Sequence, residues 1–304
     1  MPDNKIKVAH FLSGRVEMLG GGEVVVINLL KHLDRSSFNP CILSFREDRS
    51  VKPPMIIKVA EGLGFNTHMI SVRRRFDPSS VSALERFIKN ERVDVLHCHG
   101  YKADITASLL RKESRPKIVT TLHGWWMGNN LKLKFYDWLD MKSIRGFDRV
   151  IAVASHIKEE LIKKGFPPQK VVFVPNGVEV GRAASEGNKG IREGFGIPAD
   201  TAVIGIVGRL EKEKGHEFLM RSIVNLPKAV LMIVGSGPLE KELIELSERL
   251  GIKERTIFTG FRSNVKDYIS ALDIFVLPSL SEGLFWVPHY RLGFLLFSCF
   301  LAFS

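Results

Sequence analysis

The chain has 304 residues, of which 45% are hydrophobic and 25% are charged. This balance is typical of a globular protein with two domains of ordinary size and excludes wholesale disorder. The formal net charge of +11 favours an anionic partner. Because the basic residues are scattered, with no aromatic-interleaved platform and no zinc-finger spacing, the sequence predicts no nucleic-acid partner.

Cysteine usage and hydropathy indicate a cytoplasmic protein. The three cysteines Cys41, Cys98 and Cys299 are odd in number and widely spaced, which is typical of reduced thiols. The N-terminus enters a strand pattern without a signal-peptide h-region, and the apolar run at 292–303 is too short to span a bilayer. The first domain carries a basic cluster at Arg73–Arg75 and an aromatic pair at Trp125-Trp126. These groups make it a candidate for peripheral contact with the inner face of an anionic membrane.

Apolar segments that suit parallel strands alternate with amphipathic helical segments from the start of the chain. The predicted strands are 7–13, 40–45, 67–72, 93–99, 117–123, 149–155 and 171–175. The predicted helices are 23–33, 56–62, 80–89, 103–111, 131–144 and 156–164. This alternation predicts a doubly wound parallel sheet with right-handed crossovers. We therefore assign residues 1–177 to a first Rossmann-like domain.

A second series of the same kind follows residues 178–200, which carry no strand-like run and are predicted to connect two domains. Its predicted strands are 203–207, 230–235, 256–260 and 274–277, and its predicted helices are 215–225, 239–250 and 265–271. Residues 201–284 are therefore predicted to form a second, incomplete Rossmann-like domain, with the ligand cleft between the two domains.

The alternation breaks off after Leu284. Residues 285–304, FWVPHYRLGFLLFSCFLAFS, have no helix-capping signal and no clear amphipathic period. They form an aberrant apolar tail where the pattern requires another helix. We therefore expect a chain that is truncated or frameshifted after about residue 284.

A cationic loop follows the strand at 203–207. Gly208 ends that strand, and Arg209 and Lys214 lie on the connection to the next helix, which Gly215 leads into. Ligands of open α/β sheets bind outside the carboxyl ends of the strands, and cations beside a helix N-terminus suit a phosphate. The spacing alone is compatible both with a phosphate site and with a simply solvated loop.

Two further glycine-rich loops lie between a strand and a helix. Gly20-Gly21-Gly22 precedes the first helix, and Gly235-Ser236-Gly237-Pro238 precedes a later one. Their N–H groups could cradle a phosphate, or the glycines could serve the turn alone. The first loop does not complete a dinucleotide fingerprint, because Val25 stands where the third glycine belongs. This disfavours a nicotinamide-dependent dehydrogenase.

Several polar residues fall at predicted strand ends. His97 and His99 share a face while Cys98 points away, which is poor geometry for a three-ligand metal site, so no metal is predicted. One of these histidines remains a candidate for a polar site lining. His123 ends the next strand, where a catalytic and a structural role stay open. Glu282 is a carboxylate that could contact sugar hydroxyls or cap a helix.

In combination, these segments resemble the motifs of family 4 glycosyltransferases of the GT-B type, over about residues 5–284. The segments that carry the resemblance are Gly20-Gly21-Gly22-Glu23, Thr121-Leu122-His123-Gly124, Val174-Pro175-Asn176-Gly177-Val178, Gly208-Arg209-Leu210 with Lys214-Gly215, Gly235-Ser236-Gly237-Pro238-Leu239, Phe258-Thr259-Gly260, and Pro278-Ser279 leading to Glu282-Gly283.

The resemblance implies two Rossmann-like domains, with a nucleotide-diphosphate sugar bound mainly by the second. Arg209 and Lys214 would hold the diphosphate and neutralise the departing nucleotide, so no metal or other cofactor is required. Gly235 and Gly237 would belong to the same donor site. The expected reaction is sugar transfer with retention, from a UDP- or GDP-linked donor to a glycan or lipid-linked acceptor.

The resemblance also assigns roles near the donor sugar. His123 would be the active-site histidine, Gly21 and Gly22 would border the acceptor and the phosphates, and Glu282 would be the first glutamate of the E-x7-E motif. The second glutamate of that motif is replaced by Tyr290, so we expect an impaired enzyme. The alternatives are a non-catalytic donor- or glycan-binding remnant and a nucleotide-sugar 2-epimerase.

Overall fold

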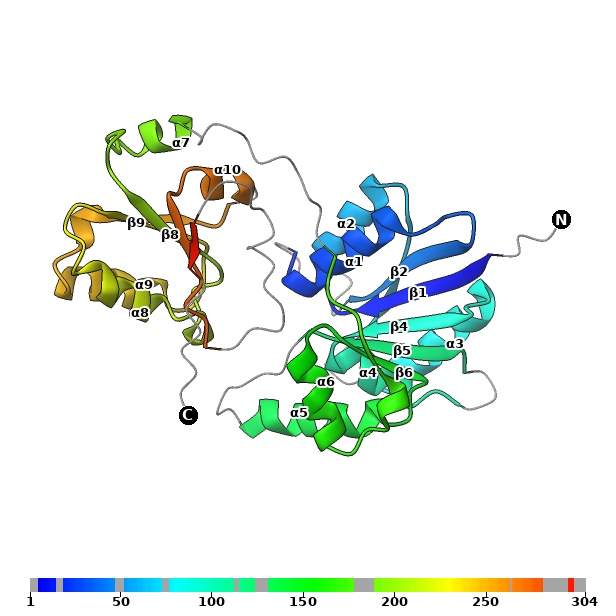
Figure 1. Cartoon of the computed structure of the whole chain (residues 1–304). Helices are drawn as coiled ribbons and strands as arrows, with labels where there is room; N and C mark the ends of the chain where they lie inside the picture. Colours follow the sequence, from blue (N-terminus) through cyan, green and yellow to red (C-terminus); the bar gives the residue numbers. More distant parts are fainter. Residues whose placement is uncertain are drawn as a thin grey trace. The chain divides into compact units, whose positions relative to one another are not determined.

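The computed structural model describes residues 5–14, 19–46, 52–72, 77–111, 115–123, 131–177, 189–262, 264–280 and 295–297. The chain divides into two compact units, with the division between Glu179 and Val180. Each unit is a parallel sheet with helices packed on it (Figure 1). The predicted fold class, α/β with two parallel-sheet domains, is therefore confirmed.

Unit 1 contains a seven-stranded sheet in the order β3-β2-β1-β4-β5-β6-β7, and every neighbouring pair is parallel. The strands are β1 Ile6–Leu12, β2 Phe38–Arg46, β3 Asn66–Ser71, β4 Val95–His99, β5 Lys117–Leu122, β6 Arg149–Ala152 and β7 Val171–Phe173. The order reverses between β1 and β4. Ligands of such sheets bind at the carboxyl ends of the strands at this kind of switch point.

The helices of unit 1 cover both faces of its sheet, as the near-continuous apolar strands require. They are α1 Gly21–His32, α2 Met55–Gly62, α3 Ser79–Glu91, α4 Tyr101–Ser108, α5 Leu131–Ile144 and α6 Ser155–Lys163. One core cluster packs Val26 and Leu30 of α1 against Ile42 of β2 and Ile56 of α2. This packing fixes the start of α1 at the carboxyl end of β1.

Unit 2 contains a five-stranded sheet in the order β10-β9-β8-β11-β12, with its switch point between β8 and β11. The strands are β8 Val203–Val207, β9 Val230–Val234, β10 Thr256–Gly260, β11 Ile274–Val276 and β12 Leu295–Phe297, and the helices are α7 Lys189–Gly194, α8 His216–Ile223, α9 Glu240–Arg249 and α10 Val265–Ser270. β12 lies inside the predicted tail 285–304 and pairs in parallel with β11. This part of the tail therefore extends the sheet.

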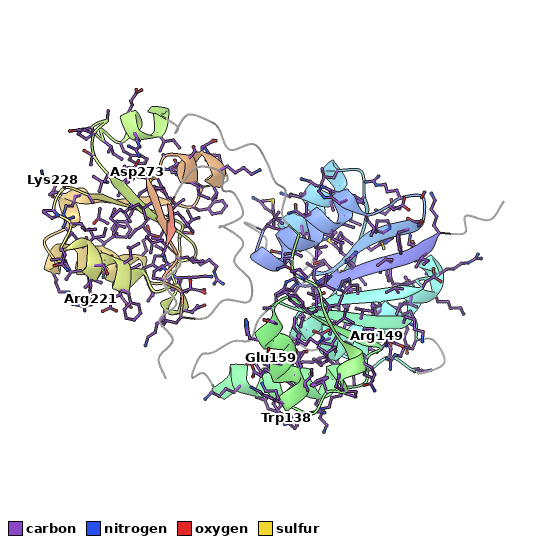
Figure 2. The ribbon with its side chains drawn as sticks, viewed as in Figure 1. Trp138, Arg149, Glu159, Arg221, Lys228 and Asp273 are labelled. Atoms are coloured by element: carbon purple, nitrogen blue, oxygen red, sulfur yellow. The ribbon has the colours of Figure 1, made fainter. Side chains whose placement is uncertain are left out.

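Helix α7 lies inside the segment predicted as a plain connection. Its Arg192 forms an ion pair of 2.8 Å with Asp273, the residue labelled in Figure 2. The other carboxylate oxygen of Asp273 accepts a hydrogen bond from the Val203 N–H. Ile197, just beyond the helix, is buried in the core of unit 2. The end of the predicted connection is therefore part of unit 2. Within the described ranges, no helix has both the length and the apolarity to cross a membrane.

Candidate active site

Helix α1 begins in the predicted glycine-rich loop. Gly20 is its N-cap, and the Gly20 N–H donates to the carboxylate of the buried Glu23. A carboxylate in the first turn also stabilises the positive end of the helix dipole. A Cβ on Gly21 would meet nothing within 4 Å, whereas a Cβ on Gly22 would lie 3.1 Å from Cδ2 of His123. The structure thus brings Gly22 and His123 into contact.

Four histidines gather at the carboxyl ends of β1, β4 and β5. His97 and His99 lie in β4 and His123 directly follows β5, as predicted. His10 joins them from β1, because the strand register pairs it with His97. His10 escapes prediction from the sequence because it sits within an apolar run that is typical of a core strand. The group lies at the switch point of the unit 1 sheet.

Two hydrogen bonds link three of these rings into what we call the histidine chain, His10–His99–His123. Nδ1 of His10 lies 3.2 Å from Nε2 of His99, and Nδ1 of His99 lies 3.4 Å from Nε2 of His123. The ring of His97 lies beside that of His99, with centroids 4.2 Å apart and a tilt of 34°, but Nε2 of His97 lies 2.7 Å from Oγ1 of Thr121. His97 is therefore a neighbour of the histidine chain, and its hydrogen bond goes to β5.

Burial lowers the pKa of all four histidines. The pKa falls to about 4 for His10 and for His123. For His97 and His99, burial and then the neighbouring histidines hold the pKa well below 6.5. Each ring is therefore neutral at pH 7 and carries a single N–H. A neutral imidazole can donate one hydrogen bond, but it is a poor proton donor at this pH.

His10, His97 and His99 are also the one group of three potential metal ligands among the described residues, with one nitrogen of each within 4.8 Å of the others. The sequence predicts no metal site, because His97, Cys98 and His99 do not share one face and no other Cys/His cluster is evident; it does not show that His10 joins His97 and His99. A shared ion requires the ring edges to converge on one point. The rings of His97 and His99 are instead tilted by 34° with their centroids 4.2 Å apart, and Nε2 of His97 is hydrogen-bonded to Oγ1 of Thr121. This arrangement favours hydrogen-bonded rings over a shared ion.

In unit 2, residues 208–215 form the cationic loop, which follows β8 at the switch point of the sheet. It passes through a short 3-10 turn at Lys212–Lys214 and ends at Gly215, the N-cap of α8. Arg209 forms an ion pair with the buried carboxylate of Glu211, which orients its guanidinium. The stem of Lys214 packs over Gly208, with Cδ 3.7 Å from where a Cβ would stand.

The glycine-rich loop after β9 packs against the cationic loop backbone to backbone. The Leu210 N–H donates to the carbonyl of Ser236 at 3.0 Å. Gly235 has φ of 144°, and a Cβ there would lie 1.9 Å from the carbonyl oxygen of Gly208. A Cβ on Gly237 would lie 2.6 Å from the carbonyl oxygen of Leu210. Side chains at these two positions would push the loops apart, which explains the glycines.

A third loop, after β11, is joined to the same place. The Leu280 N–H donates to the carbonyl of Glu213 at 2.8 Å, and a Cβ on Gly215 would lie 2.0 Å from the carbonyl oxygen of Pro278. We call residues 208–215, 235–238 and 277–280 the loop cluster. The structure therefore brings together Arg209, Lys214, Gly235 and Gly237, which the sequence assigned to one donor site.

Some predicted residues lie outside the described part of the chain. These are Glu282 and Tyr290 of the E-x7-E segment, and the Arg73–Arg75 and Trp125-Trp126 groups. The assignments of Glu282 and of the membrane-facing groups stay predictions. The segment before Glu282 is placed as far as Leu280, within the loop cluster.

His216 is a further polar residue of this region that sequence reasoning missed. It is the first residue of α8 and only 2% exposed, and neither ring nitrogen has a hydrogen-bond partner among the described residues. Burial, followed by the charge of Lys214, lowers its pKa to about 4. Buried polar atoms are normally paired, so His216 adds two unfilled hydrogen-bonding positions next to the cationic loop. The only signal in the sequence is its place directly after Gly215.

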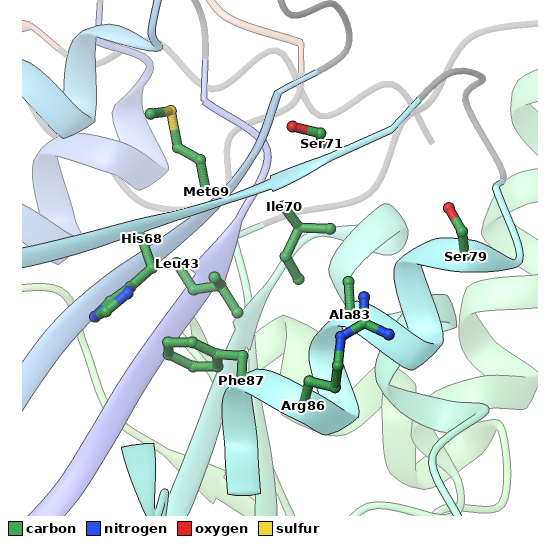
Figure 3. A pocket seen from close by; sticks show the side chains of 9 residues that line it. All are labelled: Leu43, His68, Met69, Ile70, Ser71, Ser79, Ala83, Arg86 and Phe87. Atoms are coloured by element: carbon green, nitrogen blue, oxygen red, sulfur yellow. The ribbon is translucent and has the colours of Figure 1, made fainter. Parts of the chain in front are cut away.

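A separate cavity of about 360 Å³ lies between the edge strand β3 and α3. Figure 3 shows Leu43, Ile70 and Phe87 grouped along it, with Arg86 projecting from α3. None of the predicted site residues lines this cavity.

Comparison with known protein families shows which family contains the histidine group of unit 1 and the loop cluster of unit 2. The family described as Glycosyltransferase Family 4 matches residues 19–182, which is more than half of the chain, and Glycosyl transferases group 1 matches residues 188–287. The chain belongs to glycosyltransferase family 4. The resemblance inferred from the sequence motifs is thus confirmed.

Individual relatives of this family 4 chain agree with the assignment. It is 30% identical over 222 residues to the Escherichia coli UDP-Gal:alpha-D-GlcNAc-diphosphoundecaprenol alpha-1,3-galactosyltransferase, a match that covers 68% of this chain and 57% of that protein. It is 26% identical over 303 residues to the putative glycosyltransferase EpsF of Bacillus subtilis, covering 93% of this chain and 76% of that protein. The chain therefore spans little more than half the length of the first of these relatives.

Solved structures support the fold. The structure of Anabaena HepE in complex with UDP-glucose matches with a TM-score of 0.75 at 19% identity, over 90% of this chain and 74% of that chain. WaaG, a glycosyltransferase involved in lipopolysaccharide biosynthesis, matches with a TM-score of 0.67 at 13% identity, over 90% of this chain and 76% of that chain. Both likenesses concern the two-domain GT-B fold.

Proposed function

We propose that this protein is a retaining glycosyltransferase that moves a hexosyl group from a UDP-linked sugar to a lipid-linked or glycan acceptor. The observation that carries the proposal is the loop cluster. Three loops at the carboxyl ends of β8, β9 and β11 are joined by backbone contacts that only glycine permits at Gly235 and Gly237, and they carry Arg209 and Lys214. Such a rigid cationic frame suits a diphosphate.

In this proposal Arg209 and Lys214 stabilise the charge of the diphosphate, as a bound metal ion does in other enzymes. Negative charge accumulates on the nucleoside diphosphate as its bond to the sugar breaks, and fixed cations stabilise that charge without reorganising. Arg209 is held by Glu211, while Lys214 contributes a point charge. The family pattern adds His123 and Glu282 near the donor sugar and Gly21 and Gly22 beside the acceptor.

The donor and acceptor classes rest on the relatives. The name of the Escherichia coli relative specifies UDP-galactose as donor and a diphosphoundecaprenol-linked GlcNAc as acceptor, and the HepE structure holds UDP-glucose. A net charge of +11 is compatible with both anionic substrates. We expect no divalent metal requirement, and a location in the cytoplasm at the inner face of the membrane.

The test is transfer of labelled sugar by the purified full chain. UDP-galactose, UDP-glucose and GDP-mannose are each incubated with a GlcNAc-diphosphate lipid, and the anomeric configuration of the product is read by NMR. The proposal expects lipid-bound label from a UDP-sugar, at a rate lowered by the replacement of the second motif glutamate with Tyr290, together with an α-linked product and no loss of activity with EDTA. Donor binding without transfer to any acceptor would indicate a non-catalytic donor-binding protein, and an inverted product would refute retention.

A further inference from the structure

We propose that His10 and His99 are positioning residues that hold His123 in the tautomer with its proton on Nδ1, so that His123 presents this N–H as its one hydrogen-bond donor. The carrying observation is the histidine chain, whose two hydrogen bonds run from the buried His10 to His123. The consequence for catalysis rests on the proposed function, whereas the tautomer itself does not.

The direction of the histidine chain follows from how many protons it holds. Each neutral ring has one N–H, so both hydrogen bonds must point the same way along the chain. Either His10 donates to His99 and His99 donates to His123, or both bonds run in reverse. In the first case the proton of His123 lies on Nδ1, and in the second it lies on Nε2.

The buried end of the chain decides between the two directions. Nε2 of His10 is buried and has no hydrogen-bond partner among the described residues. In the reverse direction this atom would be an N–H donor without an acceptor, the rarer and costlier kind of unpaired buried group. In the forward direction it is a bare lone pair. The forward direction is therefore favoured, and it leaves Nε2 of His123 as an acceptor.

The surroundings of His123 leave its Nδ1–H as the hydrogen-bond donor available to a ligand. The Cδ2–Nε2 edge of the ring faces Gly22, where a Cβ would stand 3.1 Å from Cδ2 and 3.3 Å from Nε2. Nε2 also receives the bond from His99. His123 makes no other hydrogen bond within the described part of the chain, so Nδ1–H is the group left for an oxygen of a bound nucleotide sugar.

Two substitutions of His99 separate positioning from packing. In His99→Asn the side-chain amide takes the place of Nδ1 and retains a donor toward His123. In His99→Gln the amide reaches the place of Nε2, so the contact with His10 is retained and the donor toward His123 is lost. The matched control is His97→Gln, whose amide can keep the bond to Thr121 while His97 makes no hydrogen bond to His123.

The experiment reads the His123 tautomer by long-range ¹H–¹⁵N spectra of the full chain with ¹⁵N-labelled histidine, and requires no substrate. We expect an Nδ1–H tautomer in the wild type, in His99→Asn and in His97→Gln, and an Nε2–H form, which is favoured in water, in His99→Gln. In the transfer assay, His99→Gln should lower kcat by about 10- to 100-fold with little change in donor KM, because the ring is mispositioned. His99→Asn should restore most of this loss.

The wild-type spectrum alone can overturn the proposal, because an Nε2–H tautomer of His123 would mean that the hydrogen bonds of the histidine chain run in the reverse direction. If His99→Asn and His99→Gln have the same His123 tautomer and the same kcat, His99 has only a structural role. Stoichiometric Zn²⁺ that shifts the resonances of His10, His97 and His99 together would replace the histidine chain by a metal site. If the tautomers follow the expectation but no sugar is transferred, the histidine chain stands and the proposed function fails.

Discussion

Replacing Asp140 by asparagine should make the protein more stable above neutral pH. Asp140 of α5 and Asp104 of α4 are buried, with exposed fractions of 7% and 0%, and neither has an ion-pair partner among the described residues. Burial raises the pKa of Asp140 from 3.8 to about 7. Burial and the neighbouring Asp140 also raise the pKa of Asp104.

The sign and size of the effect follow from linkage. Because the folded pKa lies above the unfolded one, the unfolded chain releases this proton first, and stability is lost as pH rises from 3.8 through about 7. At pH 8 the ionised Asp140 therefore lowers the free energy of unfolding by about 4 kcal/mol at most. An asparagine amide carries no charge but still needs hydrogen-bond partners. We therefore expect Asp140→Asn to raise the free energy of unfolding by about 1–3 kcal/mol at pH 8.

The assay is urea unfolding of wild type and Asp140→Asn at pH 5 and pH 8. The gain should be large at pH 8 and small at pH 5. Asp148→Asn is a control of opposite sign, because there burial is outweighed by the Ile118 N–H and Lys117, which hold the pKa of Asp148 below its usual value. Equal stability changes for Asp140→Asn at both pH values, or destabilisation at pH 8, would refute the reasoning.

Three further predictions concern the packed glycines and the histidines. Gly22→Ala should lower kcat because its Cβ meets His123 at 3.1 Å, whereas Gly62→Ala, at the end of α2 with nothing within 4 Å of its Cβ, should leave kcat unchanged. Equal kcat values in the two variants would contradict the contact between Gly22 and His123. Gly235→Ala should destabilise unit 2 by more than about 3 kcal/mol in urea unfolding, whereas Gly251→Ala, at φ 66° in open space, should cost about 1 kcal/mol. Acid should destabilise unit 1 as pH falls from 6.5 towards 4, because histidines in the unfolded chain bind protons before the buried ones do. His10 and His123 should each lower the free energy of unfolding by up to about 3 kcal/mol. Hydrogen-exchange protection of β1 that does not change over this pH range would refute the prediction.

The sheets could be predicted because buried parallel strands are apolar along their whole length. Residues 203–207 and 256–260 were predicted to be strands with the bounds that the structure has. Helix α7 was not predicted, because its six residues include two glycines and a single apolar side chain, and its ion pair from Arg192 to Asp273 joins positions far apart in the sequence.

The candidate site was only partly predictable for a related reason. Strand ends and glycine loops mark His123, Arg209 and Lys214 in the sequence. His10 meets His99 only through the register of β1 against β4, and Asp104 meets Asp140 only through helix packing. A single sequence shows neither which strand residues face one another nor which helix faces pack together. Polar residues inside apolar segments are therefore interpreted as part of the core.

The measurement that tests the central claim most directly is calorimetric titration of UDP into the full chain and its variants. We predict that UDP binds, and that Arg209→Gln and Lys214→Gln each weaken binding by about 10-fold or more, since each removes a charged contact to the diphosphate. Arg221→Gln, which removes an equal charge from the exposed face of α8 (Figure 2), should bind UDP as the wild type does. Unchanged affinity in both loop variants, or equal weakening by Arg221→Gln, would contradict a donor site in the loop cluster.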